Sequence, residues 1–286
     1  MRERSALARL ASSYRAAAFG AFVVAAFIAG ALLARVVAPA DPNAIGTVSF
    51  RAPEAGAFLG TDNLGRDVFS RMLYGARTSL LVGFLAALGA TLVGVLVGAA
   101  SGYYGGPVDD LLMRVTELFQ VTPRLILAIV VVALFGATVG IVVAVIAIVS
   151  WPATARLVRA QVLSLRVREF VQAAHALGAS DSRVIVRAIL PNVAGIIVVE
   201  ASFQAANAIL LEAGLSFLGL GDPALVSWGL MLQQAQPFLR RAWWLAVFPG
   251  GAIALVVLGL NLFGDGLNDA LNPRRAARRG AVRAQA

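Results

Sequence analysis

The sequence predicts an all-α protein that crosses a membrane several times. Of its 286 residues, 59% are hydrophobic and 14% are charged, whereas a soluble domain is about 45–50% apolar and about 25% charged. Several windows approach or exceed the roughly 20 consecutive apolar residues that cross a bilayer as a helix. These runs do not alternate between polar and apolar positions, so they do not indicate a transmembrane β-barrel.

Composition also excludes several functional classes. The chain has no cysteine and one histidine, which excludes disulfides and cysteine nucleophiles and argues against a metal centre. In a soluble protein, a net charge of +9 would suggest a nucleic-acid partner. Here the arginines adjoin apolar runs, so membrane topology explains them better, and no nucleic acid is expected.

Six membrane spans are predicted along the chain. The apolar block at 125–151 fits one long helix or parts of two, which leaves five or six spans. Arginines near span ends favour the cytoplasm, and they gather at both ends of the chain, so both termini are expected to be cytoplasmic and the number of spans even. The predicted spans lie at about 16–38, 78–104, 111–136 with a kink near Pro123, 138–158, 192–213 and 243–264.

The spans divide the chain into three parts. Residues 1–75 hold the N-terminal tail, the first span and an external loop, and an outer amphipathic helix is predicted at 61–77. Residues 76–273 hold a five-helix core, and 274–286 form an arginine-rich cytoplasmic tail. The first apolar run exceeds the about 7–15 residues of a signal-peptide core, so it is expected to be retained. Trp243 and Trp244 are expected to anchor the chain at the membrane surface.

A polar segment, FVQAAHALGASDSRVIVRAILPN at 170–192, interrupts the apolar chain between the fourth and fifth predicted spans. Residues 169–177 favour a short helix, Gly178 permits a turn, and Ser180 or Asp181 can cap a second short helix. The alanine pair leaves one face of the first helix low and flat, which suits close approach by another protein. An ordinary amphipathic loop on the lipid surface is the alternative.

This segment resembles the cytoplasmic coupling loop of ABC-importer permeases, whose pattern is E-A-A-x-x-x-G followed by I-x-L-P. Here Gln172 replaces the glutamate and Ala188 replaces the isoleucine, while Gly178 and Pro191 keep their spacing. Longer stretches are similar to the C-type permease of dipeptide, oligopeptide and nickel importers. These stretches are FLGTDNLGRDVFSRMLYGARTSL at 58–80, ARLVRAQVLSLRVREFVQAAHALGAS at 155–180, EAGLSFLGLGDP at 212–223 and GDGLNDALNPR at 264–274.

The resemblance implies a permease that passes a peptide or related small solute from an external binding protein to the cytoplasm. It implies a second homologous permease subunit and two cytoplasmic ATPases that bind ATP and Mg²⁺, in a lipid bilayer that is a bacterial or archaeal inner membrane. This chain has no G-x-x-x-x-G-K-[ST] pattern and no lysine, so it is not expected to hydrolyse ATP itself. The residues expected to couple ATPase movement to the spans are Glu169, Gln172, Ala173, Ala174, His175, Gly178 and Pro191.

A second polar set lies in the middle of the fifth predicted span. Glu200, Gln204 and Asn207 are spaced to share one helix face. A carboxylate in a bilayer is costly and faces protein or water, so this face is predicted to line the translocation path. An internal hydrogen-bond cluster between helices is the alternative. Were Glu200 an ion or proton site, the chain would be a self-sufficient secondary transporter, but no inverted repeat supports that class.

Three further charged residues, Arg114, Glu117 and Arg124, begin the third predicted span. They are interpreted as interfacial charges, with an i,i+3 pair between the first two. A membrane-embedded enzyme has little support, because no arrangement of a nucleophile and a base is present. No catalytic residue and no metal ligand are predicted.

Overall fold

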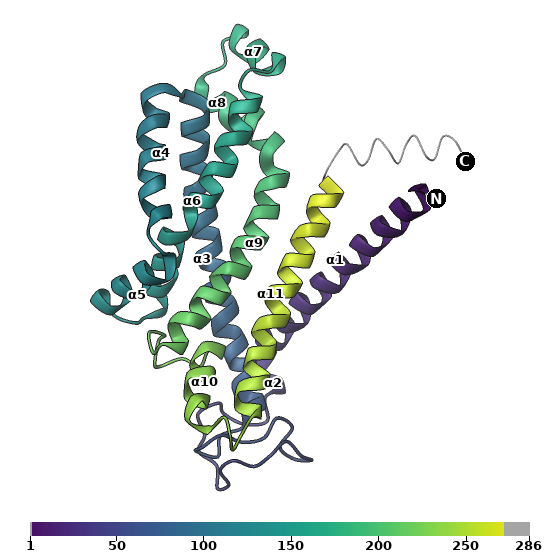
Figure 1. Cartoon of the computed structure of the whole chain (residues 1–286), viewed down its shortest axis with the longest axis vertical. Helices are drawn as coiled ribbons and strands as arrows, with labels where there is room; N and C mark the ends of the chain where they lie inside the picture. Colours follow the sequence, from purple (N-terminus) through teal and green to yellow (C-terminus); the bar gives the residue numbers. More distant parts are fainter. Residues whose placement is uncertain (1, 272–286) are drawn as a thin grey trace.

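The protein is an assembly of long helices (Figure 1). The computed structural model describes the backbone of residues 2–271 and the side chains from residue 15 onward, so the predicted arginine-rich tail lies outside the described residues. The helices in chain order are α1 (Arg2–Leu32), α2 (Ala34–Val37), α3 (Val68–Tyr104), α4 (Gly106–Val121), α5 (Arg124–Phe135), α6 (Val139–Leu165), α7 (Glu169–Ala176), α8 (Asp181–Val184), the π-helix η1 (Ile185–Ile189), α9 (Leu190–Phe217), α10 (Trp228–Ala235), the 3₁₀-helix η2 (Gln236–Phe238) and α11 (Trp244–Leu271). No β-strand occurs between residues 2 and 271.

The predicted class, an all-α polytopic membrane protein, is confirmed. Five helical stretches are long and apolar enough to cross a bilayer: the second half of α1, α3, α6, the run from α8 through α9, and α11. Figure 1 places α7 toward one end of these helices, at the top, and α10 with the loop before α3 toward the other. These are called the α7 end and the α10 end below.

The predicted third span is not one gently kinked helix. α4 ends at Val121 and α5 begins at Arg124, and the two helices are bent by 87° at the break. Proline has no N–H for the helix and holds the preceding residue in extended backbone. Thr122, which precedes Pro123, is extended with ψ 127°. The described helices therefore make five spans, or six if the bent pair crosses the membrane as one.

The predicted amphipathic helix at 61–77 is also wrong in its start and its separateness. Residues 61–67 are not helical, and α3 begins at Val68. Asp67 caps it, because its Oδ2 accepts a hydrogen bond from the Ser70 N–H at 2.7 Å. No proline follows until residue 104, so the outer segment and the second span form one helix of 37 residues. The expected boundary at residue 75 falls inside this helix.

The α3–α6 pair is the most extensive helix contact in the fold, and three glycines of α3 make it close. A Cβ atom on Gly98 would lie 2.4 Å from the carbonyl oxygen of Ala155, and one on Gly102 would lie 2.8 Å from that of Arg159. A Cβ on Gly94 would lie 2.5 Å from Cβ of Thr154. Small residues spaced four apart let two helix backbones approach within a membrane. Any larger side chain here would force α3 and α6 apart.

The loop between α2 and α3 is tied to the start of α11 at the α10 end. The Trp244 side chain is buried, and its indole Nε1–H donates to the Thr61 carbonyl oxygen at 3.2 Å. The expectation that Trp244 anchors the chain at the membrane surface is therefore wrong, because its ring is covered by protein. Trp243 is exposed, and its role as a membrane anchor stays a prediction.

Candidate coupling surface and polar face

The predicted turn at Gly178 is confirmed. α7 ends in two backbone hydrogen bonds, from the Gly178 N–H to the His175 oxygen at 2.9 Å and from the Ala179 N–H to the Ala174 oxygen at 3.0 Å. This pair of bonds is the Schellman ending of a helix, which needs a left-handed residue after the last turn. Gly178 has φ +79°, a conformation that other residues adopt only with strain. The turn therefore depends on this glycine.

The prediction that a second short, separate helix follows the turn is wrong. α8, η1 and α9 form one continuous helical run from Asp181 to Phe217. The Leu190 N–H donates to the Ile185 oxygen five residues back, which is the π-helical pattern. Pro191 has no N–H to donate to residue 187, and the chain takes up the π-helix directly before it. Movement of the start of α8 is therefore passed to α9 without an intervening loop.

The predicted caps of this second helix are not made by side chains. α8 does begin at Asp181, but neither Ser180 nor Asp181 accepts a capping hydrogen bond from it. Asp181 instead accepts a hydrogen bond from Tyr103, at the end of α3, with 2.8 Å between Oδ1 and the phenol oxygen. The same phenol oxygen lies 3.1 Å from Nε2 of His175. Tyr103 thus joins the end of α3 to both α7 and α8.

A small apolar cluster seats α7 and α8 on the membrane helices. Val171 of α7 is 1% exposed and packs with Val184 and Ile189 of the following run. In the spans, the same cluster contains Val158 and Val162 of α6 and Ala99 of α3. We call these six buried residues the α7 cluster. It links α7, which packs against α8 and η1, with the ends of α3 and α6.

Most of the predicted coupling residues lie on the surface of the α7 end. Ala174 is half-buried against the α7 cluster, and the Gln172 side-chain amide donates to the Val167 oxygen at 3.3 Å. The exposed ones are Glu169, Gln172, Ala173, His175, Gly178 and Pro191. Apolar side chains are exposed beside them, with Leu177 at 89% and Phe170 at 42%. Apolar side chains grouped on a protein surface are typical of a contact with another protein.

The three residues of the predicted polar face of α9 differ in how far they are buried. Gln204 is 2% exposed, and its amide donates to the Ser150 oxygen at 2.9 Å and to Oγ1 of Thr154 at 3.1 Å. It thus joins α9 to α6, which favours the alternative of an internal hydrogen-bond cluster for this residue. Glu200 is half-buried and Asn207 is exposed, so these two reach the surface of the chain.

An ion pair that sequence reasoning missed fixes α4 near the α7 end. Asp109, in the first turn of α4, accepts from Arg159 of α6 at 2.6 Å (Nε to Oδ1) and 2.5 Å (Nη2 to Oδ2). Ser101 of α3 donates to the same carboxylate. Paired bonds between a guanidinium and a carboxylate give orientation as well as attraction. The four-residue repeat of small residues before Ser101 marked this seam, but nothing local marked Asp109 as its partner.

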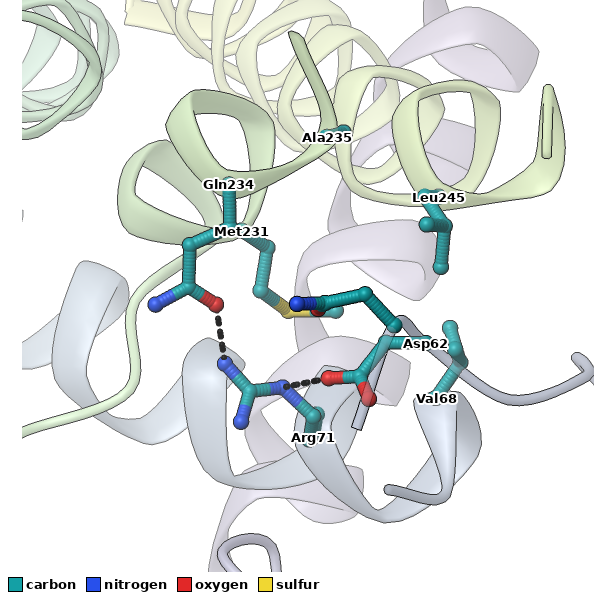
Figure 2. A pocket seen from close by; sticks show the side chains of 8 residues that line it. Asp62, Val68, Arg71, Met231, Gln234, Ala235 and Leu245 are labelled. Carbon is teal, nitrogen blue, oxygen red and sulfur yellow. Dashed lines mark hydrogen bonds and ion pairs between the residues drawn. The ribbon is translucent and has the colours of Figure 1, made fainter. Parts of the chain in front are cut away.

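A second missed cluster lies at the α10 end (Figure 2). Asp62 and Arg71 are both buried, and Nε of Arg71 lies 3.8 Å from Oδ2 of Asp62. Arg71 also donates through Nη2 to Oε1 of Gln234 in α10 at 2.8 Å and through Nη1 to the Pro42 oxygen at 3.2 Å. Arg66 completes the cluster with 2.6 Å from its Nε to Asp62. The cavity beside Arg71 measures about 20 Å³, the size of one water molecule.

Glu212 of α9 is a third residue that was missed. It is buried, and its carboxylate accepts from Ser79 of α3 at 2.9 Å and from Ser216 at 2.7 Å. The Ser79 oxygen in turn accepts from the Trp228 backbone N–H at 3.2 Å. The group therefore joins α3, α9 and α10. A second carboxylate in the apolar helix that carries Glu200, with a serine four residues on, was the available signal.

Comparison with known proteins decides the family. A family model described as "Binding-protein-dependent transport system inner membrane component" matches residues 90–277. The chain belongs to this family. The match includes the whole coupling segment and the polar residues Glu200, Gln204 and Asn207 of α9. The predicted resemblance is confirmed. This permease is thus an inner membrane component and not an enzyme, and nothing in the family supports a self-sufficient transporter built on Glu200.

Curated relatives extend the match over most of the permease. The dipeptide transport system permease protein DppC of Alkalihalophilus pseudofirmus is 41% identical over 254 residues, which cover 88% of this chain and 82% of the relative. A putative peptide transport system permease protein of Brucella abortus is 39% identical over 269 residues, or 93% and 90% of the two chains.

Among solved structures, a chain of the MetNI methionine ABC transporter in an inward-facing conformation matches with a TM-score of 0.57. It is 16% identical, and the match covers 71% of this permease and 96% of that chain. At this identity the likeness bears on the fold alone. The described residues contain no group of three or more His, Asp or Glu that could hold a metal ion.

Proposed function

We propose that this permease carries dipeptides or other short peptides into the cytoplasm as part of an ATP-driven importer. In this proposal it pairs with a second homologous permease and rests on two cytoplasmic ATPases, which bind ATP and Mg²⁺. An external binding protein delivers the peptide at the α10 end. Both termini lie in the cytoplasm, in agreement with the arginines at the two ends of the chain. The names of the relatives support the substrate class.

The observation that carries the proposal is the build of the α7 end. α7 exposes an apolar surface outward and is seated inward by Val171 and by the Tyr103 hydrogen bond. A protein that docks on this surface and moves therefore pushes on α3 and α6 through packed side chains. Because α8 continues into α9, the same movement reaches the span that carries Glu200.

Each predicted residue takes a part in this mechanism. The exposed coupling residues contact an ATPase, Ala174 seats the helix, and Gly178 keeps the bend that separates α7 from α8. Glu200 and Asn207 face the path between the two permeases. Gln204 keeps α9 on α6 while the path opens and closes, because its amide bonds bridge these two helices.

The absence of cysteine from the chain allows a direct test. In cells that transport a dipeptide, His175→Cys is treated with a thiol cross-linker, and the captured partner is identified by mass spectrometry. The expected main product joins the permease to an ATPase subunit. The matched control is Phe58→Cys, an exposed position in the loop of the α10 end, which should capture no ATPase. Free labelling of His175→Cys from the cytoplasm without ATPase capture would refute the coupling role.

A further inference from the structure

A cavity of about 370 Å³ lies at the α10 end, beside the first turns of α3. One of its walls is a single face of α3, formed by Tyr74, Arg77, Thr78 and Leu81. The other walls come from the loop before α3, the loop between α9 and α10, and Val139 at the start of α6. Ligand pockets in proteins measure about 300–1,000 Å³. The cavity is therefore large enough for a ligand group, and its lining indicates which kind.

Four polar side chains line this cavity without a partner inside the protein. Arg77 is exposed, and within residues 15–271 its guanidinium makes no ion pair and no hydrogen bond. In the same part of the chain, the side chains of Asn43, Tyr74 and Thr78 also make no hydrogen bond. No acidic side chain of the described residues lines the cavity. The lining therefore offers one positive charge and three neutral polar groups, which suits an anion with several oxygen atoms.

An apolar stripe continues from the cavity along α3. Leu81 lines the cavity, and leucines follow at i+4, i+7 and i+11 on the same helix face, at Leu85, Leu88 and Leu92. All four are exposed, by 46% to 56%. The stripe from Leu81 to Leu92 is about 17 Å long at 1.5 Å per residue. Half of the hydrocarbon core of a bilayer is about 15 Å thick, so the stripe matches the length of an acyl chain in one leaflet.

The length of α3 places the cavity beside the lipid headgroups. Its 37 residues rise about 55 Å, whereas the hydrocarbon core is about 30 Å thick, so α3 extends beyond the core. Arg77 lies one turn beyond Leu81 on the side of the α10 end, and Tyr74 lies almost one turn further. Tyrosine is enriched at the membrane–water interface. The cation therefore lies at the level of the headgroups, while the leucines lie at the level of the acyl chains.

We propose that this cavity binds the phosphate headgroup of an anionic phospholipid in the leaflet at the α10 end. Arg77 pairs with the phosphate, because a planar guanidinium matches phosphate oxygens, and the hydroxyls of Tyr74 and Thr78 donate to the remaining oxygens. One acyl chain lies along the leucine stripe. The lining has no acidic partner for the ammonium group of a zwitterionic lipid, so headgroups with a net negative charge bind more tightly. The inference does not depend on which solute the permease carries.

A lipid in this cavity would link elements that are distant in the sequence. Its headgroup would contact α3, the start of α6 and residues 224–226 of the loop between α9 and α10. Within the protein, Asp222 of that loop already accepts a hydrogen bond from the Val139 N–H at 3.2 Å. A ligand that binds the folded state and not the unfolded state raises stability by mass action. The proposed lipid should therefore stabilise the permease, which gives a measurement that does not require transport.

The test uses the full-length permease, purified in detergent and freed of phospholipid, with phosphatidylglycerol as the probe. Added phosphatidylglycerol should raise the thermal unfolding midpoint of the wild type. Arg77→Gln should raise the half-saturating lipid concentration about tenfold, which corresponds to about 1.4 kcal/mol. Arg240→Gln is the matched control, because Arg240 is an exposed arginine between η2 and α11 that does not line the cavity, and it should respond as the wild type. Before lipid is added, all three proteins should unfold at similar temperatures, since Arg77 has no partner within the described residues.

Three outcomes would overturn the assignment. If Arg77→Gln responds to phosphatidylglycerol as the wild type does, its guanidinium does not bind the headgroup. If phosphatidylcholine raises the midpoint as much as phosphatidylglycerol does, the cavity does not select a net negative charge. If inorganic phosphate alone gives the full rise, the cavity binds a free anion and not a lipid.

A second measurement keeps Arg77 and so covers the case in which its variant does not fold. Thr78→Cys is placed in vesicles and treated with an uncharged maleimide. Labelling should be at least about fivefold slower in phosphatidylglycerol than in phosphatidylcholine, because a bound lipid covers the site by mass action. Phe58→Cys, an exposed position of the α10 end outside the cavity, should label at the same rate in both. Equal rates at Thr78→Cys would refute the lipid site, and protection by an added binding protein but not by phosphatidylglycerol would show a protein contact in its place.

Discussion

At the α7 end, the turn that shapes the coupling segment is closed by hydrogen bonds between residues three and five positions apart, such as Ala174 and Ala179. At the α10 end, Arg71 and Gln234 meet across 163 positions of chain. The turn at the α7 end uses a glycine and backbone bonds, and most of the coupling residues around it are exposed. The α10 end uses buried charges that only the complete fold brings together. The coupling segment, which is moved by its partner, can be shaped by contacts between residues close in sequence. The α10 end needs contacts between distant residues, because these hold several helices together.

The mechanical consequence follows from this difference. If α7 shifts as a unit, its own turn stays intact, and the strain falls on the few side chains that seat it, including Val171 and Tyr103. A shift at the α10 end would instead break buried charge contacts in several elements at once. We therefore expect the α10 end to stay rigid while the α7 end moves, and the following predictions compare the two.

Arg71→Ala is expected to give the largest loss of stability. It removes the hydrogen bonds to Gln234 and Pro42, while Asp62 keeps its pair with Arg66 and two backbone N–H donors. Each lost hydrogen bond from the charged guanidinium costs about 1.5–3 kcal/mol. The thermal unfolding midpoint of the purified permease in detergent measures the effect. Arg77→Ala, six residues along the same helix and exposed, is the control and should shift the midpoint little. Equal shifts would mean that the α10 end does not depend on its charged cluster.

Gly178→Pro is expected to act on transport more than on folding. Proline fixes φ near −65° and has no N–H, whereas Gly178 has φ +79° and donates to the His175 oxygen. The bend after α7 would be lost, because proline cannot adopt the left-handed backbone that this turn needs, and peptide uptake per ATP hydrolysed should fall about tenfold or more. Because the segment is local, the unfolding midpoint should move less than in Arg71→Ala. Normal coupled uptake would contradict the role of the bend.

The same contrast explains what the sequence could predict. The turn at Gly178 and the helical spans follow from local signals: a glycine, a proline and runs of apolar residues. The sequence predicted only a kink at Pro123, so the split of the third span was missed. The bend of 87° depends on how α5 packs against α6 and α9. The Asp62–Arg71 cluster was missed because a pairing of Arg71 with Gln234 has no local signature. Gln204 was placed on the correct helix face, but only the packing of α6 shows that this position is covered.

Gly98→Ala tests the α3–α6 seam, which carries force away from the α7 end. The added Cβ would lie 2.4 Å from the Ala155 oxygen, and this overpacking is expected to cost about 1–3 kcal/mol. Gly251→Ala in α11 is the matched control, because nothing lies within 4 Å of a Cβ there and alanine favours a helix by about 1 kcal/mol over glycine. The unfolding midpoint should therefore fall in the first variant and hold or rise in the second. A fall in both would show that the seam is not special.

Tyr103→Phe should have the smallest effect on stability and the clearest effect on coupling. Its hydroxyl is the side-chain tie from α3 to α7 and α8, and the loss of this hydrogen bond to Asp181 costs about 1 kcal/mol, since exposed Asp181 can turn to water. Val171 still seats α7, so assembly with the ATPases should persist. ATP hydrolysis should continue while the peptide imported per ATP falls about threefold, as about 0.7 kcal/mol of linkage is lost. Tyr104→Phe is the matched control, because among the described residues its hydroxyl has no hydrogen-bond partner. If both variants couple normally, the Tyr103 hydroxyl is not needed for coupling, and the packing of Val171 transmits the movement. The α7 end would then work without this long-range polar contact, in sharper contrast to the α10 end.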